Sequence, residues 1–378
     1  MRVKVRFVCL ALAAFVPVAS WSQVRPSLQG YAKALPLTSR SLLTDERFFL
    51  GLNRVRLQGL LDVGGVLHTE VWLDSELLVG DFLTTPDYAF RQLLQRPTFL
   101  DLDWTVAEGE RYVLQQRLFR AFATLYLGSA EVTVGRQRIA WGTGFAWNPT
   151  DLLNPFNPAA IELDEKEGVD AVHVSLPFGA LSRLEAVYAP GRGELEPSFA
   201  LRVGHNLGGY DFSVMGGAFR NVGTVGGDFV GYLGGAALRG EFAYTWSDTA
   251  RNFLRAVVNL DYNFAFDLYT VVEFYYNGQG AARKEDYDLR QLLTGLSFNL
   301  ARFYVAVSAV KTVTPLLQVG VYDLLNLVDG STLLGPTVTY SLATNLEFSA
   351  STYFFLGPDD SEFGALPNVL FGHLQFFF

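Results

Sequence analysis

The sequence predicts an all-β fold, a transmembrane antiparallel β-barrel of about 18 strands, with about 16 as the alternative. Three observations support this prediction. A leader of the secretory type comes first, and many later segments alternate apolar and polar residues. None of those segments is apolar over the roughly 20 residues that a membrane helix requires.

Residues 1–22 have the order expected of a signal peptide. Three basic residues precede an apolar run at 7–18, and small residues follow it. We expect cleavage after Ser22, with cleavage after Ser20 or an uncleaved anchor as alternatives. Because the single cysteine, Cys9, lies in this leader, we expect no disulfide in residues 23–378, which should form one barrel domain.

Alternation at period two is the main evidence for strands. In the segment 252–262, Leu254 and Val258 lie on one face, and Arg255 and Asp261 lie on the other. All such segments together give candidate strands at 27–35, 47–59, 64–77, 112–127, 131–141, 169–177, 181–189, 196–204, 209–219, 226–234, 237–246, 252–262, 268–277, 302–312, 315–326, 331–341, 345–356 and 369–378.

The fifth candidate strand departs from regular alternation. Val132 and Val134 share a face with Arg136 and Arg138, although charged side chains should not face lipid. We expect a β-bulge at Gly135, which would return both arginines to the barrel interior.

Long and short connections alternate along the chain. The long ones lie at 78–110, 142–168, 278–301 and 357–367. This alternation predicts short periplasmic turns and longer external loops, with both termini in the periplasm. The final apolar positions, which include Phe376 and Phe378, resemble the terminal insertion signal of outer-membrane barrels, and this implies recognition by the barrel-assembly machinery.

A soluble β-sandwich or propeller would show similar alternation. Tyrosine and tryptophan near the strand ends favour a membrane barrel, because these rings collect at membrane interfaces. The sequence has no repeat of blade length, which argues against a propeller.

The most distinctive segment follows the fifth candidate strand. It contains Gly135-Arg136-Gln137, Trp141-Gly142, Asn148-Pro149 and Asn154-Pro155. Each Asn-Pro pair can begin a turn or a short helical piece, so we expect an ordered loop.

This segment resembles one found in uncharacterised porin-like outer-membrane proteins of Gram-negative bacteria. The resemblance covers the mature chain in layout but is specific only here and at Phe378. It implies a channel of the bacterial outer membrane, in contact with lipid and lipopolysaccharide, for passive diffusion of small polar solutes. It names no substrate and leaves open whether the chain is a monomer or an oligomer.

The third external loop of general porins folds into the lumen, and residues 142–168 form the third external loop here. The resemblance therefore implies that this loop narrows the pore. The residues expected near the constriction are Arg136, Arg138, Trp141, Trp147 and Asp151. Alternatively, the two arginines only tie the loop to the wall.

The predicted inner wall carries charges of both signs. These residues are Arg54, Arg56, Glu70, Asp74, Arg183, Glu185, Arg202, Asp211, Arg239, Glu241, Arg255, Asp261, Glu273 and Glu347. Because opposite charges on a wall pair with each other, the pattern predicts a wetted lumen without a clear preference for anions or cations.

Composition and spacing argue against several other functions. Loss of the leader changes the formal net charge from −9 to about −12, so we expect no nucleic-acid partner. The acidic residues at 162–170 do not have the spacing of a calcium-binding loop. We therefore expect a solvated acidic loop, no metal and no cofactor.

We also expect no enzymatic activity. His68, His173 and His373 fall on predicted inner faces and His205 in a short turn, so none is placed as a base at the lipid boundary. No Gly-x-Ser-x-Gly motif occurs. The alternatives are an outer-membrane lipid-modifying enzyme and a plugged structural or adhesive barrel. In the plugged barrel, a helix at 287–296 would block the lumen.

Overall fold

The structure is a computed structural model that describes residues 24–93, 98–155, 157–162, 165–166, 168–193, 195–246, 251–289 and 299–378. The expected signal peptide and most of the expected helix at 287–296 lie outside these residues.

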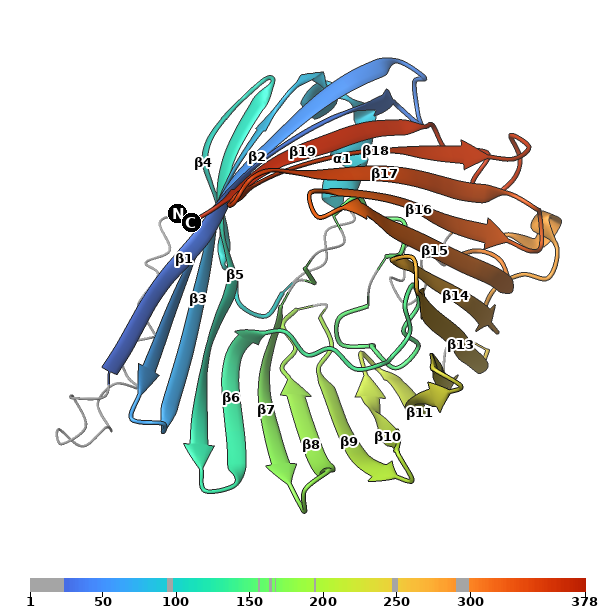
Figure 1. Ribbon diagram of the computed structural model, residues 1–378. Helices are drawn as coiled ribbons and strands as arrows, with labels where there is room; N and C mark the ends of the chain where they lie inside the picture. Colours follow the sequence, from blue (N-terminus) through green and yellow to red (C-terminus); the bar gives the residue numbers. More distant parts are fainter. Residues whose placement is uncertain are drawn as a thin grey trace.

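The described residues form one antiparallel sheet that closes on itself (Figure 1). Closure occurs at β1, which pairs with β2 along one edge and with β19 along the other. The strands are β1 (Val24–Arg40), β2 (Arg47–Val63), β3 (Leu67–Val79), β4 (Asp103–Gly109), β5 (Tyr112–Leu127), β6 (Ala130–Gln137), β7 (Val169–Pro177), β8 (Ser182–Ala189), β9 (Ser198–Leu207), β10 (Tyr210–Phe219), β11 (Val222–Leu233), β12 (Ala236–Trp246), β13 (Phe253–Phe264), β14 (Leu268–Asn277), β15 (Phe303–Thr314), β16 (Leu317–Asn326), β17 (Thr332–Ala343), β18 (Leu346–Leu356) and β19 (Val369–Phe377). The helices are η4 (Asp81–Thr84), α1 (Pro86–Leu93) and η5 (Lys284–Asp286).

The prediction of an 18-stranded barrel is confirmed, since every strand except β4 belongs to the closed wall. β4 was not predicted and lies within the expected loop 78–110. It pairs with β5 from Tyr112 to Arg117, on the edge that β6 leaves open by ending at Gln137. Pairing there satisfies backbone groups of β5 that would otherwise form an exposed edge.

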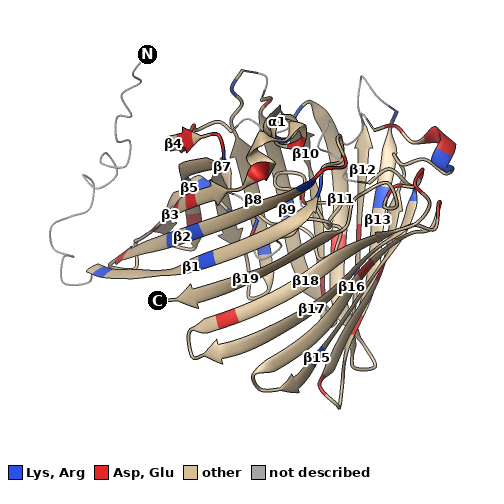
Figure 2. Cartoon of the chain, turned by 90° about the horizontal axis from the view of Figure 1, so that it is seen from above, with Lys and Arg blue, Asp and Glu red and all other residues tan. Residues whose placement is uncertain are grey.

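The outer face of the wall is apolar. On β13, Leu254, Val258 and Leu260 are exposed, whereas Arg255 and Asn259 are buried on the inner face. Rows of exposed leucine, valine and aromatic side chains around a closed sheet fit lipid, not water. Figure 2 shows strands β15–β19 largely free of charged residues. No described helix is long and apolar enough to cross a membrane.

The two ends of the barrel differ as predicted. Short turns such as 128–129 and 344–345 lie at the end that holds both termini, and the longer connections lie at the opposite end. Among the longer ones, residues 138–168 follow β6 and are the third from the N-terminus. Figure 1 shows that this green segment turns into the barrel interior.

The predicted bulge at Gly135 is wrong. β6 pairs one-to-one with β5 and β7 through this residue, so Arg136 keeps the face of Val132 and Val134. Its charge is satisfied by Asp170, which lies opposite on β7 at 2.9 Å. The backbone carbonyl of Leu100 also accepts from Arg136, at 2.6 Å. The Arg136–Asp170 ion pair lies at the outer end of β6 and β7, where a loop covers it. It is therefore kept from lipid without a bulge in the strand.

Candidate pore constriction

The segment 138–168 is held against the far wall of the barrel by the carboxylate of Glu273 on β14. Its Oε2 accepts from Phe145 N at 2.5 Å, and its Oε1 accepts from Ala146 N and Trp147 N, both at 2.9 Å. Asn259 Nδ2 donates a further bond to Oε2 at 2.8 Å. A fully buried carboxylate thus binds consecutive backbone amides of the loop.

Glu241 on β12 makes a second contact of the same kind. Its Oε2 accepts from Thr143 N at 2.8 Å and Gly144 N at 3.2 Å. Its Oε1 accepts from both the backbone N and the hydroxyl of Thr150, at 2.6 and 2.8 Å. Gly144 is required in this turn, because a Cβ there would lie 1.8 Å from Trp147 O. The two glutamates therefore fix residues 143–150 from both sides of one turn.

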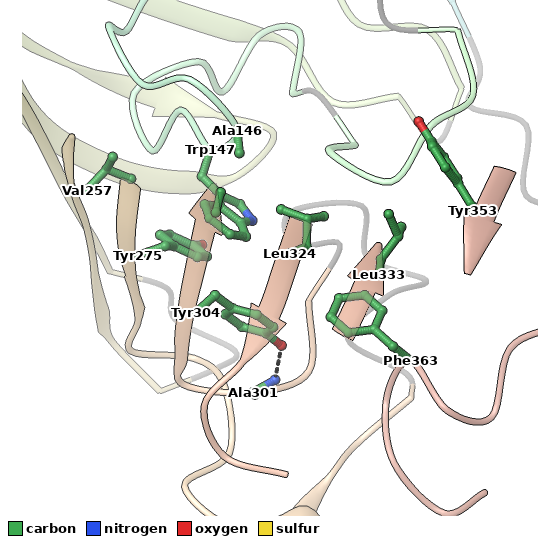
Figure 3. Packing of buried hydrophobic residues seen from close by; sticks show 11 residues of the cluster. Ala146, Trp147, Val257, Tyr275, Ala301, Tyr304, Leu324, Leu333, Tyr353 and Phe363 are labelled. Atoms are coloured by element: carbon green, nitrogen blue, oxygen red, sulfur yellow. Dashed lines mark hydrogen bonds between the residues drawn. The ribbon is translucent and has the colours of Figure 1, made fainter. Parts of the chain in front are cut away.

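Trp147 inserts its ring into an aromatic cluster on the inner wall (Figure 3). Its ring stacks on Tyr275 of β14, with centroids 4.9 Å apart and planes at 14°, and contacts Tyr304 of β15 at 5.7 Å. The indole N–H donates to Asn299 Oδ1 at 2.7 Å. Apolar packing therefore reinforces the carboxylate contacts.

A second apolar cluster holds the loop to the wall from which it departs. Ile139, Trp141, Leu152 and Leu153 of the loop are buried against inner-face residues of β7–β10. The wall residues of this cluster are Ala171, Val187, Ala200, Met215 and Phe219.

The end of the loop crosses back to β1 and β2 and forms ion pairs there. Glu162 binds Arg54 at 2.9 Å and Lys33 at 3.3 Å. Glu165 contacts Arg56, which is itself paired with Asp74 at 2.5 Å. The expectation of a solvated acidic loop is therefore wrong for these two glutamates, because the basic wall of β1 and β2 neutralises them.

The predicted site residues separate into distinct environments. Glu241 and Glu273 bind the loop on either side of Trp147. The acidic end of the loop contacts Arg54 and Arg56. Asp151 is buried against Lys166 within the loop, at 2.5 Å. Arg255 bonds to Tyr275 below Trp147 and lies beside the Phe253 ring, and Arg138 is exposed. The others lie apart: Arg136 with Asp170, Glu70 with His68, and Arg239 with Asp261.

Sequence reasoning missed Lys33, Tyr275 and Tyr304 as wall residues that contact the loop, and it missed Thr150 as a loop residue that donates to Glu241. The strands that hold the three wall residues were predicted, so the inner-facing tyrosines could have been identified from strand parity. The partners of the loop amides could not, because backbone donors have no sequence signal.

An external network ties three other loops together. Glu362, between β18 and β19, accepts from Leu300 N at 2.8 Å, from Asn326 Nδ2 at 2.7 Å and from the Tyr304 hydroxyl at 2.5 Å. Burial raises the pKa of Glu362 to about 7. This carboxyl therefore titrates near neutral pH at the outer end of β15–β18.

His205 does not lie in a turn, contrary to the prediction. It belongs to β9, and its Nδ1 lies 2.6 Å from the hydroxyl of Ser182 on β8. It shares strand parity with exposed Leu201 and Val203, so it faces outward. In the described part of the chain no carboxylate bonds to this imidazole.

No family model matches the chain, and no curated protein matches its sequence. Several solved structures match nearly all of it. OccK5 (OpdH) of Pseudomonas aeruginosa is 9% identical, with 94% of this chain and 98% of that chain covered and a TM-score of 0.59. OprD of the same organism is 9% identical, with 93% of each chain covered and a TM-score of 0.57. A mutant of the Rh. blastica porin is 14% identical, with 94% of this chain and 100% of that chain covered and a TM-score of 0.50.

Identities this low show the fold alone. Together with the apolar outer wall, the structural matches establish that the chain has the fold of outer-membrane porins and is an outer-membrane β-barrel.

Proposed function

We propose that the chain is a passive outer-membrane channel for small polar solutes, narrowed by residues 142–168. The observation that carries the proposal is the double attachment of this loop. Glu241 and Glu273 hold its first half on β12 and β14, and Arg54 and Lys33 hold its second half on β1 and β2. A segment fixed to opposite walls reduces the cross-section that a solute can use.

The wall chemistry is suited to polar solutes. Inner-face charges are mostly paired, as in Arg239 with Asp261 at 2.9 Å and Arg202 with Glu185 at 3.1 Å. Paired charges and hydroxyl groups keep water in the lumen and offer hydrogen bonds to a solute that sheds part of its hydration. We further propose that the apolar outer face contacts lipid and lipopolysaccharide.

A plugged barrel is the second candidate, and one observation favours it. The aromatic cluster around Trp147 also includes Phe363 from the loop between β18 and β19, so two external loops meet inside the same half of the barrel. If this packing extended across the lumen, no solute would pass.

We propose no hydrolytic centre at the Ser182–His205 contact. A serine nucleophile needs a base that a third group orients, and the described residues around His205 supply no such carboxylate. The plain interpretation is a hydrogen-bonded pair on the outer wall. Ser182→Ala should leave any lipid-hydrolysing activity of the preparation unchanged; loss of such activity would reinstate the enzyme alternative.

The test is single-channel conductance of the refolded mature protein in a planar bilayer. Steady channels are expected, and deletion of residues 150–157 should enlarge them. The matched control deletes α1, which also has eight residues but lies in the second external connection; its conductance should stay near the parent value. A silent bilayer from a folded, heat-modifiable barrel would refute the open channel and favour the plugged one.

A further inference from the structure

A cavity of about 730 Å³ lies in the lumen beneath the end of the constriction loop. Its walls come from β1, β2 and β17–β19, and Ile161 and Glu162 of the loop close it on one side. Gln29, Phe377 and the region of Glu347 border it near the termini, so the cavity occupies the periplasmic half of the barrel.

The charged groups that border this cavity have partners of opposite sign. Lys33 pairs with Glu162 at 3.3 Å, and Glu165 contacts Arg56. Glu347 lies 3.8 Å from His373, an ion pair when the imidazole is protonated. Apart from Glu347 when the imidazole is neutral, a permeating ion therefore meets little uncompensated charge here.

The polar groups that face the cavity between these pairs are neutral. Thr337 and Thr339 of β17 bond across to Ser351 and Ser349 of β18, at 3.2 and 3.3 Å. Gln29 donates to Gln58 at 3.0 Å across β1 and β2. Each hydroxyl keeps acceptor capacity, and the Gln29–Gln58 amide pair keeps a donor and an acceptor for a solute. The curved wall of β17–β19, β1 and β2 thus presents uncharged donors and acceptors at both of its ends.

An aromatic surface completes the lining at the periplasmic side. Phe377, the last residue of β19, borders the cavity and is 44% exposed, and its ring meets Tyr31 edge-on at 6.3 Å. Exposed aromatic rings pack against the C–H faces of ring-shaped solutes while the surrounding groups bind their polar edges.

From this lining we propose that the cavity is a subsite for neutral polyhydroxylated solutes, that is, small sugars. This inference rests on the proposed channel and names its solute class. A sugar satisfies the neutral donors and acceptors at both ends of this curved wall and keeps an apolar face for Phe377. A charged solute of the same size loses hydration without gaining a counter-charge, which is costly.

The experiment compares glucose, gluconate and glucosamine, which share one carbon skeleton but are neutral, anionic and cationic. Liposome swelling with the full mature protein should show faster entry of glucose than of either ion. The double variant T337V/T339V should reduce glucose entry and weaken glucose binding by about threefold to tenfold for each hydrogen bond to the sugar that is lost. Valine suits strands, so the barrel should still assemble.

The matched control is Thr124→Val, which removes one member of a hydroxyl pair between β5 and β6, 2.8 Å from Thr133 and away from the cavity. It should leave the glucose preference unchanged. Calorimetric titration of the detergent-solubilised protein with glucose reports the subsite even without conduction.

The outcomes separate the two proposals. Ion conductance without a glucose preference, or a preference that T337V/T339V leaves intact, overturns the subsite and keeps the channel. Glucose binding in detergent with a silent bilayer overturns the channel and keeps the subsite.

Discussion

Replacing Glu273 by glutamine should release the constriction loop from the far wall. Each carboxylate oxygen accepts two donors: Phe145 N and Asn259 Nδ2 at Oε2, and Ala146 N and Trp147 N at Oε1. Glutamine has the same shape, but its NH₂ group must occupy one of these two positions. Whichever position the NH₂ group takes, the two N–H donors at that position then face another donor and lose their hydrogen bonds.

Hydrogen bonds to a charged group contribute about 1.5 to 3 kcal/mol each, so the loss of two weakens docking by about 3 to 6 kcal/mol. That corresponds to an increase of about 10² to 10⁴ in the ratio of released to docked loop. The remaining contacts of Trp147 and Glu241 hold part of the segment, so the barrel itself should stay folded.

Two measurements check this expectation. Single-channel recordings of Glu273→Gln should show larger and noisier conductance, and hydrogen exchange should accelerate at the amides of 145–147. Glu347→Gln is the control, because it removes a carboxylate that contacts His373 and not the loop. If Glu273→Gln keeps the parent conductance and exchange protection, the carboxylates do not hold the loop and the docking argument fails.

Three further predictions follow from single contacts. Gly144→Ala should enlarge the channel as Glu273→Gln does, measured by conductance, because its Cβ would lie 1.8 Å from Trp147 O. The external network around Glu362 should be most stable in acid. Because its pKa is raised, the carboxyl binds a proton more tightly when the loop 357–368 is docked than when it is released. Protection of 357–368 against hydrogen exchange should therefore fall as pH rises from about 4.5 to 7, by at most about tenfold per pH unit. Hydrogen exchange at pH 5 and pH 8 checks this, and equal protection would contradict it. Deleting Phe378 removes two backbone bonds to β1, of 2.8 and 3.0 Å, and should lower the yield of folded barrel in outer-membrane fractions, relative to Phe378→Tyr.

The wall of this protein was predictable because its period is set by lipid on one side and water on the other. Each strand carries its own copy of that signal, so all eighteen wall strands were found. β4 was not predicted because every residue in it is exposed, so no difference between its two faces imposes alternation on its sequence. The bulge at Gly135 was predicted wrongly because the sequence does not show that Arg136 pairs with Asp170 and is covered by a loop at the outer end of β6.

The site was only half predictable. Glu241 and Glu273 were assigned correctly to the inner wall. Their partners could not be predicted, because they are backbone amides, which occur at nearly every residue of any sequence. Glu162 and Glu165 were visible as acidic residues, but their neutralisation depends on β1 and β2 reaching them across a loop of about thirty residues. Long-range pairing of this kind follows from closure of the barrel and not from any local pattern.

The placement of the inner charges leads to one more expectation, about ion selectivity. Glu241 and Glu273 bind loop amides, while Arg54 and Lys33 bind the acidic loop end, so these four charges act on the loop and not on passing ions. Selectivity requires one sign to dominate at the narrowest point. Arg138 is exposed, but it is a single charge. The parent channel should therefore show a reversal potential near zero in a tenfold salt gradient, and Arg138→Glu should shift it toward cations. A strongly selective parent channel would mean that the wall charges, although paired, still set the potential in the pore.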